Sequence, residues 1–265
     1  MSIYAATEAD DLDRCLENLT AQSLVPDQIV LVRDGPVKPG IEQCIINHSQ
    51  NLPLHHLHFP QNRGLGLALR DGLQACNHEF VARVDSDDWS VPKRFSLQVD
   101  YLVNNPSISV IGGWLKENYQ SASGPVSVAR QTPLERRSVE RIARRRNPLN
   151  HPTVMFRKSH VLASGNYEAC LLFEDYFLWA KMLMSGYHLT NLPHILVETE
   201  VDQGYFSRRG GIAYVRKEIY LMQKLKKIGF LSPVDTGIFL LSRLPMRLLP
   251  LKVRQRFYKV FLRHP

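Results

Sequence analysis

Three carboxylates follow a short apolar run near the middle of the chain. The run covers residues 80–84, and Asp85, Asp87 and Asp88 come directly after it. In an extended chain the side chains at i and i+2 lie on the same side, so Asp85 and Asp87 are expected to point toward one place. Such oxygen ligands suit Mg²⁺ or Mn²⁺, and these ions often bind the phosphates of a substrate as well. The alternative is an acidic turn that simply ends the strand.

Asp34 lies in a similar position, at the end of the apolar run QIVLVRDGP (residues 28–36). Its carboxylate could accept hydrogen bonds from the N–H groups of a nucleotide base, or it could form a turn with the Gly-Pro pair that follows. The segment NRGLG (62–66), which contains Arg63, is typical of a glycine-containing turn at a helix start, where phosphate can bind. It matches neither common glycine-rich phosphate motif, and a tight turn alone also accounts for it.

Glu174 and Asp175 begin an apolar helical segment, LLFEDYFLWAKMLMSG. Acidic residues in the first turn are favoured by the helix dipole, which is one explanation for them. The other is a general base held near the hydroxyl group of a substrate. His151, in the segment NPLNHPTVMF, could orient a ligand or pack in a turn.

The elements that must position these side chains alternate between strand and helix patterns. The predicted strands are residues 28–36, 52–59, 80–85 and 108–114. The predicted helices between and before them are residues 8–22, 41–48, 62–76 and 92–105. Such alternation predicts a mostly parallel sheet with helices on both faces, and ligands bind such sheets beyond the carboxyl ends of the strands. Asp34 and the carboxylates at 85–88 are both expected at such ends.

The composition limits the class of protein. The chain has 265 residues and a net charge of +8. Its four cysteines form no Cys-x-x-Cys pair, so neither a disulfide framework nor a zinc site is indicated. We find no secretory signal and no run of about 18 apolar residues, so the sequence predicts a cytoplasmic location.

The positive charge is concentrated near the C-terminus. From Arg208 onward there are fourteen Lys and Arg residues and two acidic ones, Glu218 and Asp235. The last 55 or so residues are predicted to be helical, basic and Leu-rich. A basic segment indicates an anionic partner, which could be nucleic acid, a membrane surface or a phosphorylated substrate.

Five segments in this order resemble glycosyltransferase family 2, the inverting enzymes of the GT-A fold. They are LDRCLENLTAQSLVPDQIVLVRDGP, NRGLGLALRDGL, FVARVDSDDW, NPLNHPTVMFRK and FEDYFLWAKML. A weaker similarity to bacterial capsule and exopolysaccharide members continues through SRRGGIAYVRKEIYLMQKLKKIGFLSP. The resemblance implies a Rossmann-like α/β catalytic domain over residues 1–200. A basic helical extension would follow over residues 201–265.

The resemblance also implies roles for the nucleotide side of the site. Asp34 would contact the donor base, and Arg63 would lie near the nucleotide sugar. Asp87 would be the direct ligand of Mn²⁺ or Mg²⁺, with Asp85 nearer the ribose and a metal-bound water. The donor would be a nucleoside-diphosphate sugar, with UDP preferred over GDP.

Further roles concern the acceptor and the diphosphate. Asp175 would be the catalytic base that deprotonates the acceptor hydroxyl. Arg208 and Arg209 would contact the diphosphate. The residues assigned to the acceptor or the donor sugar are Asp88, Trp89, His151 and Glu174.

The predicted reaction is transfer of the sugar to a hydroxyl of a saccharide acceptor, lipid-linked, in surface polysaccharide synthesis. The basic, apolar C-terminal helices would then bind an anionic membrane surface, placing the enzyme at the inner face of the cell membrane. Alternatively, these helices pack on the catalytic domain and expose only their basic faces.

Two departures from the family pattern affect these expectations. Members usually begin with a full hydrophobic strand before the residues that match Ser2-Ile3-Tyr4, so the first strand here is expected to be short or truncated. Arg33 stands where an acidic residue is common, so contacts to the base or ribose are expected to differ.

Three other functions remain as alternatives. A sugar nucleotidyltransferase also uses acidic strand ends and Mg²⁺, but it should carry a Gly-rich, Lys-bearing loop near its first strand. A nucleic-acid-binding module would interleave basic and aromatic residues on one face, whereas the basic helices here are rich in Leu and Ile, so no nucleic-acid partner is expected. The third alternative is a catalytically degenerate GT-A binding protein.

Overall fold

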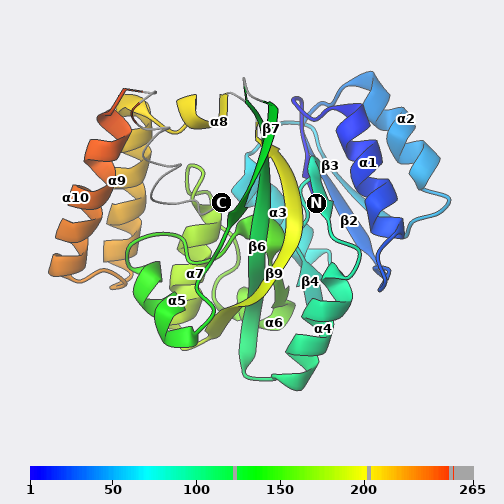
Figure 1. The fold of residues 1–265 in the computed structure, drawn as a ribbon. Coiled ribbons are helices and arrows are strands. Elements are labelled where there is room, and N and C mark those ends of the chain that lie inside the picture. Colours follow the sequence, from blue (N-terminus) through cyan, green and yellow to red (C-terminus); the bar gives the residue numbers. More distant parts are fainter. Residues whose placement is uncertain (122–123, 202–203, 251–252, 254–265) are drawn as a thin grey trace.

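The computed structural model describes residues 1–121, 124–201, 204–250 and 253. It shows two sheets with helices packed on both sides of them (Figure 1). This is the α/β architecture that the strand–helix alternation predicts.

The first sheet is parallel, as expected. It consists of β1 (Ser2–Ile3), β2 (Ile29–Asp34) and β3 (Leu54–Phe59), in the order β1-β2-β3. The first strand has only two residues, which agrees with the short strand expected from the sequence.

Alternation along β2 explains how helices cover both faces of this sheet. Ile29 and Leu31 pack with helices α1 (Ala9–Thr20) and α2 (Pro39–His48) on one face. Val30 and Val32 pack against Ala68 of α3 (Leu65–Gln74) on the other. Successive side chains of a strand point to opposite faces, so a strand that is apolar throughout can serve two helix layers.

The second sheet is mixed, not mostly parallel. Its order is β4-β8-β6-β9-β5, with β7 paired to β6. Its strands are β4 (Phe80–Ala82), β5 (Asp88–Ser90), β6 (Ile108–Ser121), β7 (Gly124–Arg130), β8 (Met155–Arg157) and β9 (His188–Val201). Only β6 and β9 run parallel; the other described pairs of this sheet are antiparallel. Only two residues separate β6 from β7, and so short a connection can join only antiparallel strands.

The remaining helices surround this sheet. They are α4 (Arg94–Asn104), α5 (Arg136–Ala143), the 3-10 turn η1 (His151–Thr153), α6 (Lys158–Ala163), α7 (Glu174–Met184), α8 (Gly204–Ser207), α9 (Gly211–Lys227) and α10 (Pro233–Leu248). Helix α7 is buried on most sides, and Trp179 and Ala180 at its centre are inaccessible to solvent. No helix within the described ranges is long and apolar enough to span a bilayer.

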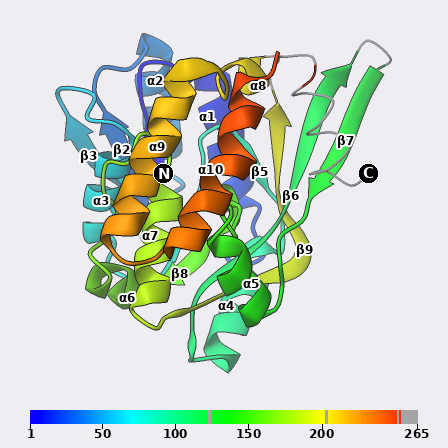
Figure 2. The ribbon, with the colours of Figure 1, turned by 90° about the vertical axis from the view of Figure 1, so that its left-hand side faces the viewer.

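The described part of the C-terminal extension packs on the catalytic part. Helices α9 and α10 lie side by side in front of α7 (Figure 2). Leu221, Leu225 and Phe239 form a buried cluster with residues of α7. The carboxylate of Glu218, which is fully buried, pairs with Arg243 and Arg247 of α10. The described part of the extension is therefore helical and basic, as predicted, and two of its arginines face inward; its last residues, 254–265, lie outside the described part of the chain.

Candidate active site

A buried arginine holds the loop that carries the acidic motif. Arg94, at the start of α4, donates from Nη2 to the carbonyl of Arg83 (2.6 Å) and from Nη1 to Oγ of Ser90 (2.9 Å). Asn18 of α1 brackets the same loop: its Nδ2 donates to the carbonyl of Ser90 (2.9 Å), and its Oδ1 accepts the Ser90 N–H (2.8 Å). The backbone on both sides of the acidic residues is thus fixed by buried polar contacts.

The three carboxylates have different surroundings. Asp87 is exposed. Asp85 is partly exposed and forms an ion pair with the buried guanidinium of Arg83. Asp88 is buried, and this burial raises its pKa to about 6, although a hydrogen bond involving Thr199 acts in the opposite direction. One solvent-facing carboxylate beside one partly exposed carboxylate fits the oxygen ligand set of a divalent cation.

A cavity of about 830 Å³ joins this motif to residues distant in sequence. It lies against β6, β9 and the C-terminal helices. Seven of the predicted site residues line it, namely Asp85, Asp87, Asp88, His151, Asp175, Arg208 and Arg209.

Asp175 is oriented by two hydrogen bonds at the start of α7. Its Oδ2 accepts from Nδ2 of Asn147, and its Oδ1 accepts the N–H of Tyr176 (2.7 Å). Burial raises the pKa of Asp175, whereas these two donors lower it. A carboxylate with a raised pKa and a fixed orientation has the properties of a general base.

Glu174, the neighbouring acid, is buried and does not line the cavity. Burial, with the negative charge of Asp175, raises its pKa to about 7. Its assignment to the acceptor or donor sugar stays a prediction.

His151 lies in the cavity wall on the 3-10 turn η1. Its Nε2 is 3.0 Å from the hydroxyl of Tyr167, and its ring meets Trp179 edge-on. Burial and the charge of Arg83 hold the pKa of His151 well below its usual value. The ring is therefore neutral near pH 7 and can take part in hydrogen bonding but not in ion pairing.

Four further arginines also line the cavity. Nη1 of Arg130 lies 3.9 Å from Oε1 of Glu117, and Arg146 lies near enough to Arg130 for the two charges to repel. Arg243 and Arg247 reach the cavity from α10. No sequence motif singles out these four arginines. Arg130 lies outside the motif segments. The basic pattern of the C-terminal segment does not indicate which of its arginines face inward.

Asn147 and Arg83 were also missed as site residues. Asn147 lies in the motif segment NPLNHPTVMFRK, and Arg83 lies in FVARVDSDDW, close to the predicted site residues of those segments. Their roles depend on contacts to Asp175 and Asp85 that only the folded chain creates.

Two predicted nucleotide-binding residues lie outside the cavity wall. The carboxylate of Asp34 accepts the N–H groups of Arg63 and Gly64, each at 2.9 Å, and so closes the turn before α3. The Arg63 side chain pairs with Asp71 (2.8 Å) and stacks on Phe59 (3.5 Å). These contacts match the turn explanation for this segment. Binding of the donor base by Asp34, or of the sugar nucleotide by Arg63, stays a prediction.

Trp89 lies on β5, with 46% of its surface exposed. It lines a smaller cavity of about 300 Å³ together with Asp87 and Asp88. It therefore stands beside the acidic motif.

One further cluster has metal-ligand chemistry. Ligand atoms of Asp13, Cys44 and His48 lie within 4.8 Å of one another on α1 and α2. Nε2 of His48 is 2.8 Å from Oδ1 of Asp13, a hydrogen bond that accounts for this contact without an ion. None of the three lines the large cavity.

Several known proteins are similar over nearly the full chain. An uncharacterized glycosyltransferase of Haemophilus influenzae is 37% identical over 99% of this chain and 97% of its own length. The amylovoran biosynthesis glycosyltransferase AmsE of Erwinia amylovora is 34% identical, over 98% and 96%. A UDP-Gal:alpha-D-GlcNAc-diphosphoundecaprenol beta-1,3-galactosyltransferase of Escherichia coli is 31% identical, over 99% and 95%.

Solved structures share the fold at low sequence identity. The mannosyltransferase PcManGT of Pyrobaculum calidifontis, in complex with GDP-Man and Mn²⁺, has a TM-score of 0.65 and 16% identity, covering 98% of this chain and 74% of that one. TarS of S. aureus (residues 1–349), in complex with UDP-GlcNAc, also has a TM-score of 0.65, with 15% identity over 98% and 75%.

The family described as "Glycosyl transferase family 2" matches residues 2–164, which hold the acidic motif, Asn147 and His151. Together with relatives above 30% identity over almost the whole length, this match decides the classification. The chain belongs to glycosyl transferase family 2 and is a glycosyltransferase of the GT-A fold.

Proposed function

We propose that this protein is an inverting glycosyltransferase of bacterial surface polysaccharide synthesis. It transfers a sugar from a nucleoside-diphosphate sugar to a hydroxyl of a saccharide acceptor carried on a lipid diphosphate. The observation that carries the proposal is the shared cavity, in which Asp85 and Asp87 lie on one wall and the oriented base Asp175 on another.

The donor side of this cavity is built for a diphosphate. Asp85 and Asp87 would hold Mn²⁺ or Mg²⁺, which when bound offsets the negative charge of the leaving nucleoside diphosphate. Arg208 and Arg209 line the same cavity and supply positive charge for the phosphates.

The acceptor side provides the proton transfer. Asp175 accepts the proton of the acceptor hydroxyl through a carboxylate oxygen as that hydroxyl attacks the anomeric carbon, and the bond to the diphosphate breaks. Asn147 keeps the carboxylate pointed into the cavity. Attack on the face opposite the leaving group inverts the anomeric centre, and no covalent enzyme intermediate is required.

Two named relatives support the acceptor class. One is named for amylovoran biosynthesis, and the other for transfer to a diphosphoundecaprenol-linked sugar. The structural neighbours hold GDP-Man and UDP-GlcNAc, so both bases occur on this fold. We propose a UDP-sugar as the donor of this protein, because the name of the Escherichia coli relative contains UDP-Gal.

Nucleotide titration tests the donor half of the proposal. In the presence of Mn²⁺, we expect wild-type protein to bind UDP but not GDP. Asp87→Asn should weaken Mn²⁺-dependent binding at least ~30-fold, because it removes one charged ligand. The matched control is Asp100→Asn, an exposed acid on α4 outside the cavity. A UDP affinity that changes neither on removal of Mn²⁺ nor in Asp87→Asn would contradict this metal site.

Turnover with a GlcNAc-diphosphate-lipid acceptor and a panel of UDP-sugars tests the transfer itself. Asp175→Asn should lower kcat about 10²- to 10⁴-fold and leave nucleotide affinity unchanged, as expected for loss of a general base. Intact binding with no turnover by wild-type protein on any donor would favour the degenerate GT-A binding protein instead.

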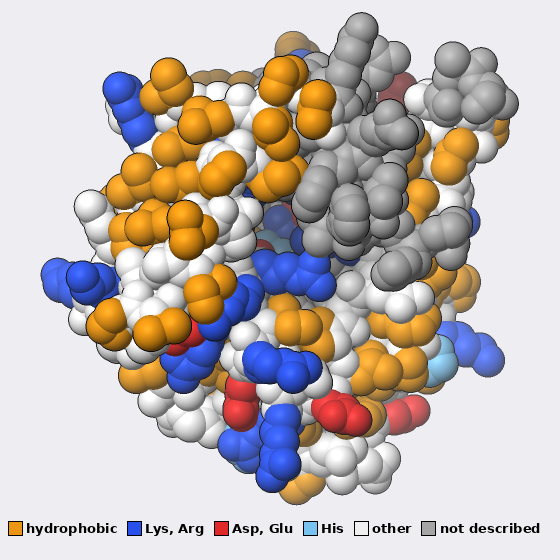
Figure 3. Space-filling view, turned by 60° about the vertical axis from the view of Figure 1, so that its left-hand side comes forward, with side chains coloured by type: hydrophobic (Ala, Val, Ile, Leu, Met, Phe, Trp, Pro, Cys, Tyr) orange, Lys and Arg blue, Asp and Glu red, His pale blue; other side chains and the backbone are white. Residues whose placement is uncertain are grey.

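A lipid-linked acceptor makes contact with the membrane useful, and α10 carries a surface suited to it. Val234, Ile238, Leu241 and Leu248 are exposed at helical spacing on this helix. Figure 3 shows hydrophobic side chains gathered over this face, with Lys and Arg nearby. Apolar residues bordered by basic ones are typical of a helix at an anionic membrane surface.

Vesicle co-sedimentation tests this peripheral binding. Wild-type protein should bind vesicles that contain about 30% anionic lipid, and salt should weaken the binding. Val234→Ser combined with Leu241→Ser should reduce the bound fraction several-fold, whereas Ile46→Ser, an exposed apolar residue of α2, should not. Equal binding by all three proteins would contradict a role for α10.

A further inference from the structure

Most of the arginines that line the large cavity have a role already. The described ones are Arg14, Arg130, Arg146, Arg208, Arg209, Arg243 and Arg247. The first of them pairs with Asp11, and the two from α10 pair with the buried Glu218. The two at 208–209 are proposed above to meet the donor diphosphate. The positive charges of Arg130 and Arg146 are left without a use.

Arg146, three residues after the end of α5, has no carboxylate partner within the described ranges. Partial burial holds the pKa of its guanidinium below the usual value, and the positive charge of Arg130 acts in the same direction. Both effects disfavour the cation where it stands. An anionic ligand at this place would offset both of them.

Arg130, at the end of β7, has one acidic neighbour and only a loose contact with it. Its Nη1 lies 3.9 Å from Oε1 of Glu117, which is too far for a hydrogen bond. Oε2 of Glu117 accepts the hydroxyl of Tyr119 (2.5 Å). This single carboxylate can offset at most one of the two arginine charges, so the pair keeps a net positive charge.

The backbone that carries the two arginines is fixed by one buried side chain. Nδ2 of Asn150 donates to the carbonyl of Arg130 (3.0 Å) and to the carbonyl of Gly113 (2.9 Å). Asn150 lies four residues after Arg146, whose own N–H donates to the carbonyl of Ile142 (2.8 Å). The strand end and the loop are thus held together by contacts that need no ligand, which lowers the cost of binding one.

Both arginines lie close to Asp175. Arg146 directly precedes Asn147, whose Nδ2 donates to Oδ2 of Asp175. The positive charge of Arg130 contributes to lowering the pKa of Asp175. In the proposed acceptor the diphosphate is bonded to the same sugar ring that bears the reacting hydroxyl. Cations that bind this diphosphate must therefore lie within about the width of one sugar ring from the base.

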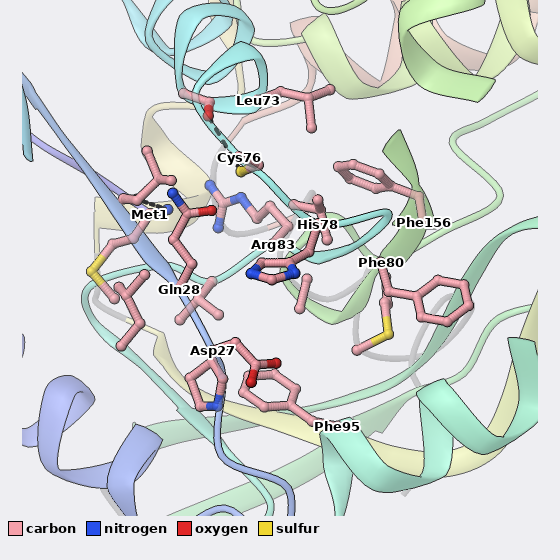
Figure 4. A pocket seen from close by; sticks show the side chains of 18 of the residues that line it. Met1, Asp27, Gln28, Leu73, Cys76, His78, Phe80, Arg83, Phe95 and Phe156 are labelled. Atoms are coloured by element: carbon pink, nitrogen blue, oxygen red, sulfur yellow. Dashed lines mark hydrogen bonds between the residues drawn. The ribbon is translucent and has the colours of Figure 1, made fainter. Parts of the chain in front are cut away.

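The other large cavity, of about 500 Å³, lacks such a pair of cations. Figure 4 shows Phe80, Phe95 and Phe156 around it. Arg83 is the only Lys or Arg among its described lining residues, and its guanidinium pairs with Asp85. Of the two cavities, the one that holds the proposed base is therefore the one suited to a phosphorylated ligand.

We propose that Arg130 and Arg146 form a binding site for the diphosphate of the acceptor, separate from the place of the donor diphosphate at Asp85 and Asp87. A guanidinium can hold a phosphate through two parallel N–H···O bonds, and a diphosphate between two of them would also end their mutual repulsion. Such a site selects acceptors that carry a diphosphate over neutral glycosides of the same sugar. This inference rests on the proposed function for the class of acceptor.

Two soluble acceptors that differ only in the diphosphate test this site. They are GlcNAc joined to an octyl chain through a diphosphate, and the octyl glycoside of GlcNAc. Each is titrated into protein saturated with UDP and Mn²⁺, and the KM and kcat for transfer are measured separately. The variants are Arg130→Gln and Arg146→Gln. The control is Arg137→Gln, an exposed arginine of α5 outside the cavity.

Wild-type protein should bind the diphosphate acceptor at least ~30-fold more tightly than the glycoside, because charged hydrogen bonds to the phosphates are made with the first alone. Each of the two variants should weaken binding of the diphosphate acceptor about 10- to 100-fold and raise its KM to match. Affinity for the glycoside and for UDP with Mn²⁺ should stay unchanged. Arg146→Lys should keep part of the binding, because it retains the charge but not the paired donors.

Three results would overturn the proposal. They are equal binding of the two acceptors by wild-type protein, unchanged acceptor binding in both glutamine variants, and an equal loss of UDP affinity in those variants with Tm unchanged, which would assign the arginines to the donor. The titrations need no turnover. Diphosphate-dependent binding through both arginines without sugar transfer would therefore support this site and contradict the proposed function.

Discussion

Asn147 offers the sharpest test of the proposed role of Asp175 as the catalytic base. Its Nδ2 donates to Oδ2 of Asp175, and this donation stabilises the carboxylate form and lowers its pKa. A hydrogen bond to a charged group contributes about 1.5–3 kcal/mol. Since one pKa unit corresponds to about 1.36 kcal/mol, Asn147→Ala should raise the pKa of Asp175 by roughly one to two units.

If Asp175 is the base, it acts in its carboxylate form, so activity is present above its pKa and is lost as the pH falls through that pKa. In Asn147→Ala the acidic limb of the kcat profile should therefore move upward by roughly one to two units. Below both pKa values the mutant should be about 10- to 100-fold slower than wild type. Above both values the two enzymes should have similar rates.

Three further variants make this experiment decisive. Asn147→Asp keeps the acceptor oxygen for the Leu149 N–H but loses the donor and adds a like charge, so its limb should move further upward. Glu174→Gln removes the neighbouring acid of raised pKa and separates its titration from that of Asp175. Asn104→Ala, on the exposed end of α4, is the control and should not move the limb. A uniform loss of rate at every pH in Asn147→Ala, with the limb unmoved, would refute the reasoning.

Two stability predictions follow from packing. Glu218→Gln leaves two arginines of α10 without their buried anion, so the free energy of unfolding in urea should fall by about 3–5 kcal/mol. The control is Glu42→Gln, which breaks an exposed ion pair and should lower that free energy by ~0.5 kcal/mol or less. Equal losses in the two variants would contradict the role of the buried pair. At Gly66 an added Cβ would lie 2.6 Å from the carbonyl oxygen of Glu168, so Gly66→Ala should destabilise the folded protein by about 1–3 kcal/mol. Gly237 lies in open space within α10, so Gly237→Ala should stabilise the folded protein by about 0.5–1 kcal/mol. The same denaturation series measures both, and a stabilising Gly66→Ala would show that the α3 backbone can move away.

Local pattern was enough to predict most elements and the acidic part of the site. β2, β3 and the helices after them follow from apolar runs and turn residues that need no distant partner. The acidic residues at 85–88 were identifiable because three charges after an apolar run are unusual wherever that run packs. Asp175 was found in the same way, as an acid at the start of an apolar helix.

The direction of the strands in the second sheet could not be predicted in this manner. A strand of three residues, such as β4 or β8, carries too little pattern to show which neighbour it pairs with or which way it runs. Those choices are made by contacts between segments far apart in the chain, as when Val81 pairs with Phe156.

The kinds of chemical group in this protein can be read from its sequence: carboxylates at strand and helix ends, a basic C-terminal segment, and an α/β frame. Which of these groups share a cavity depends on the folded chain. It directed Asp34 into a turn and brought Arg243 and Arg247 inward to Glu218. The physical reason is that charge and periodicity are properties of neighbouring residues, whereas burial and ion pairing depend on which distant segments the fold brings into contact.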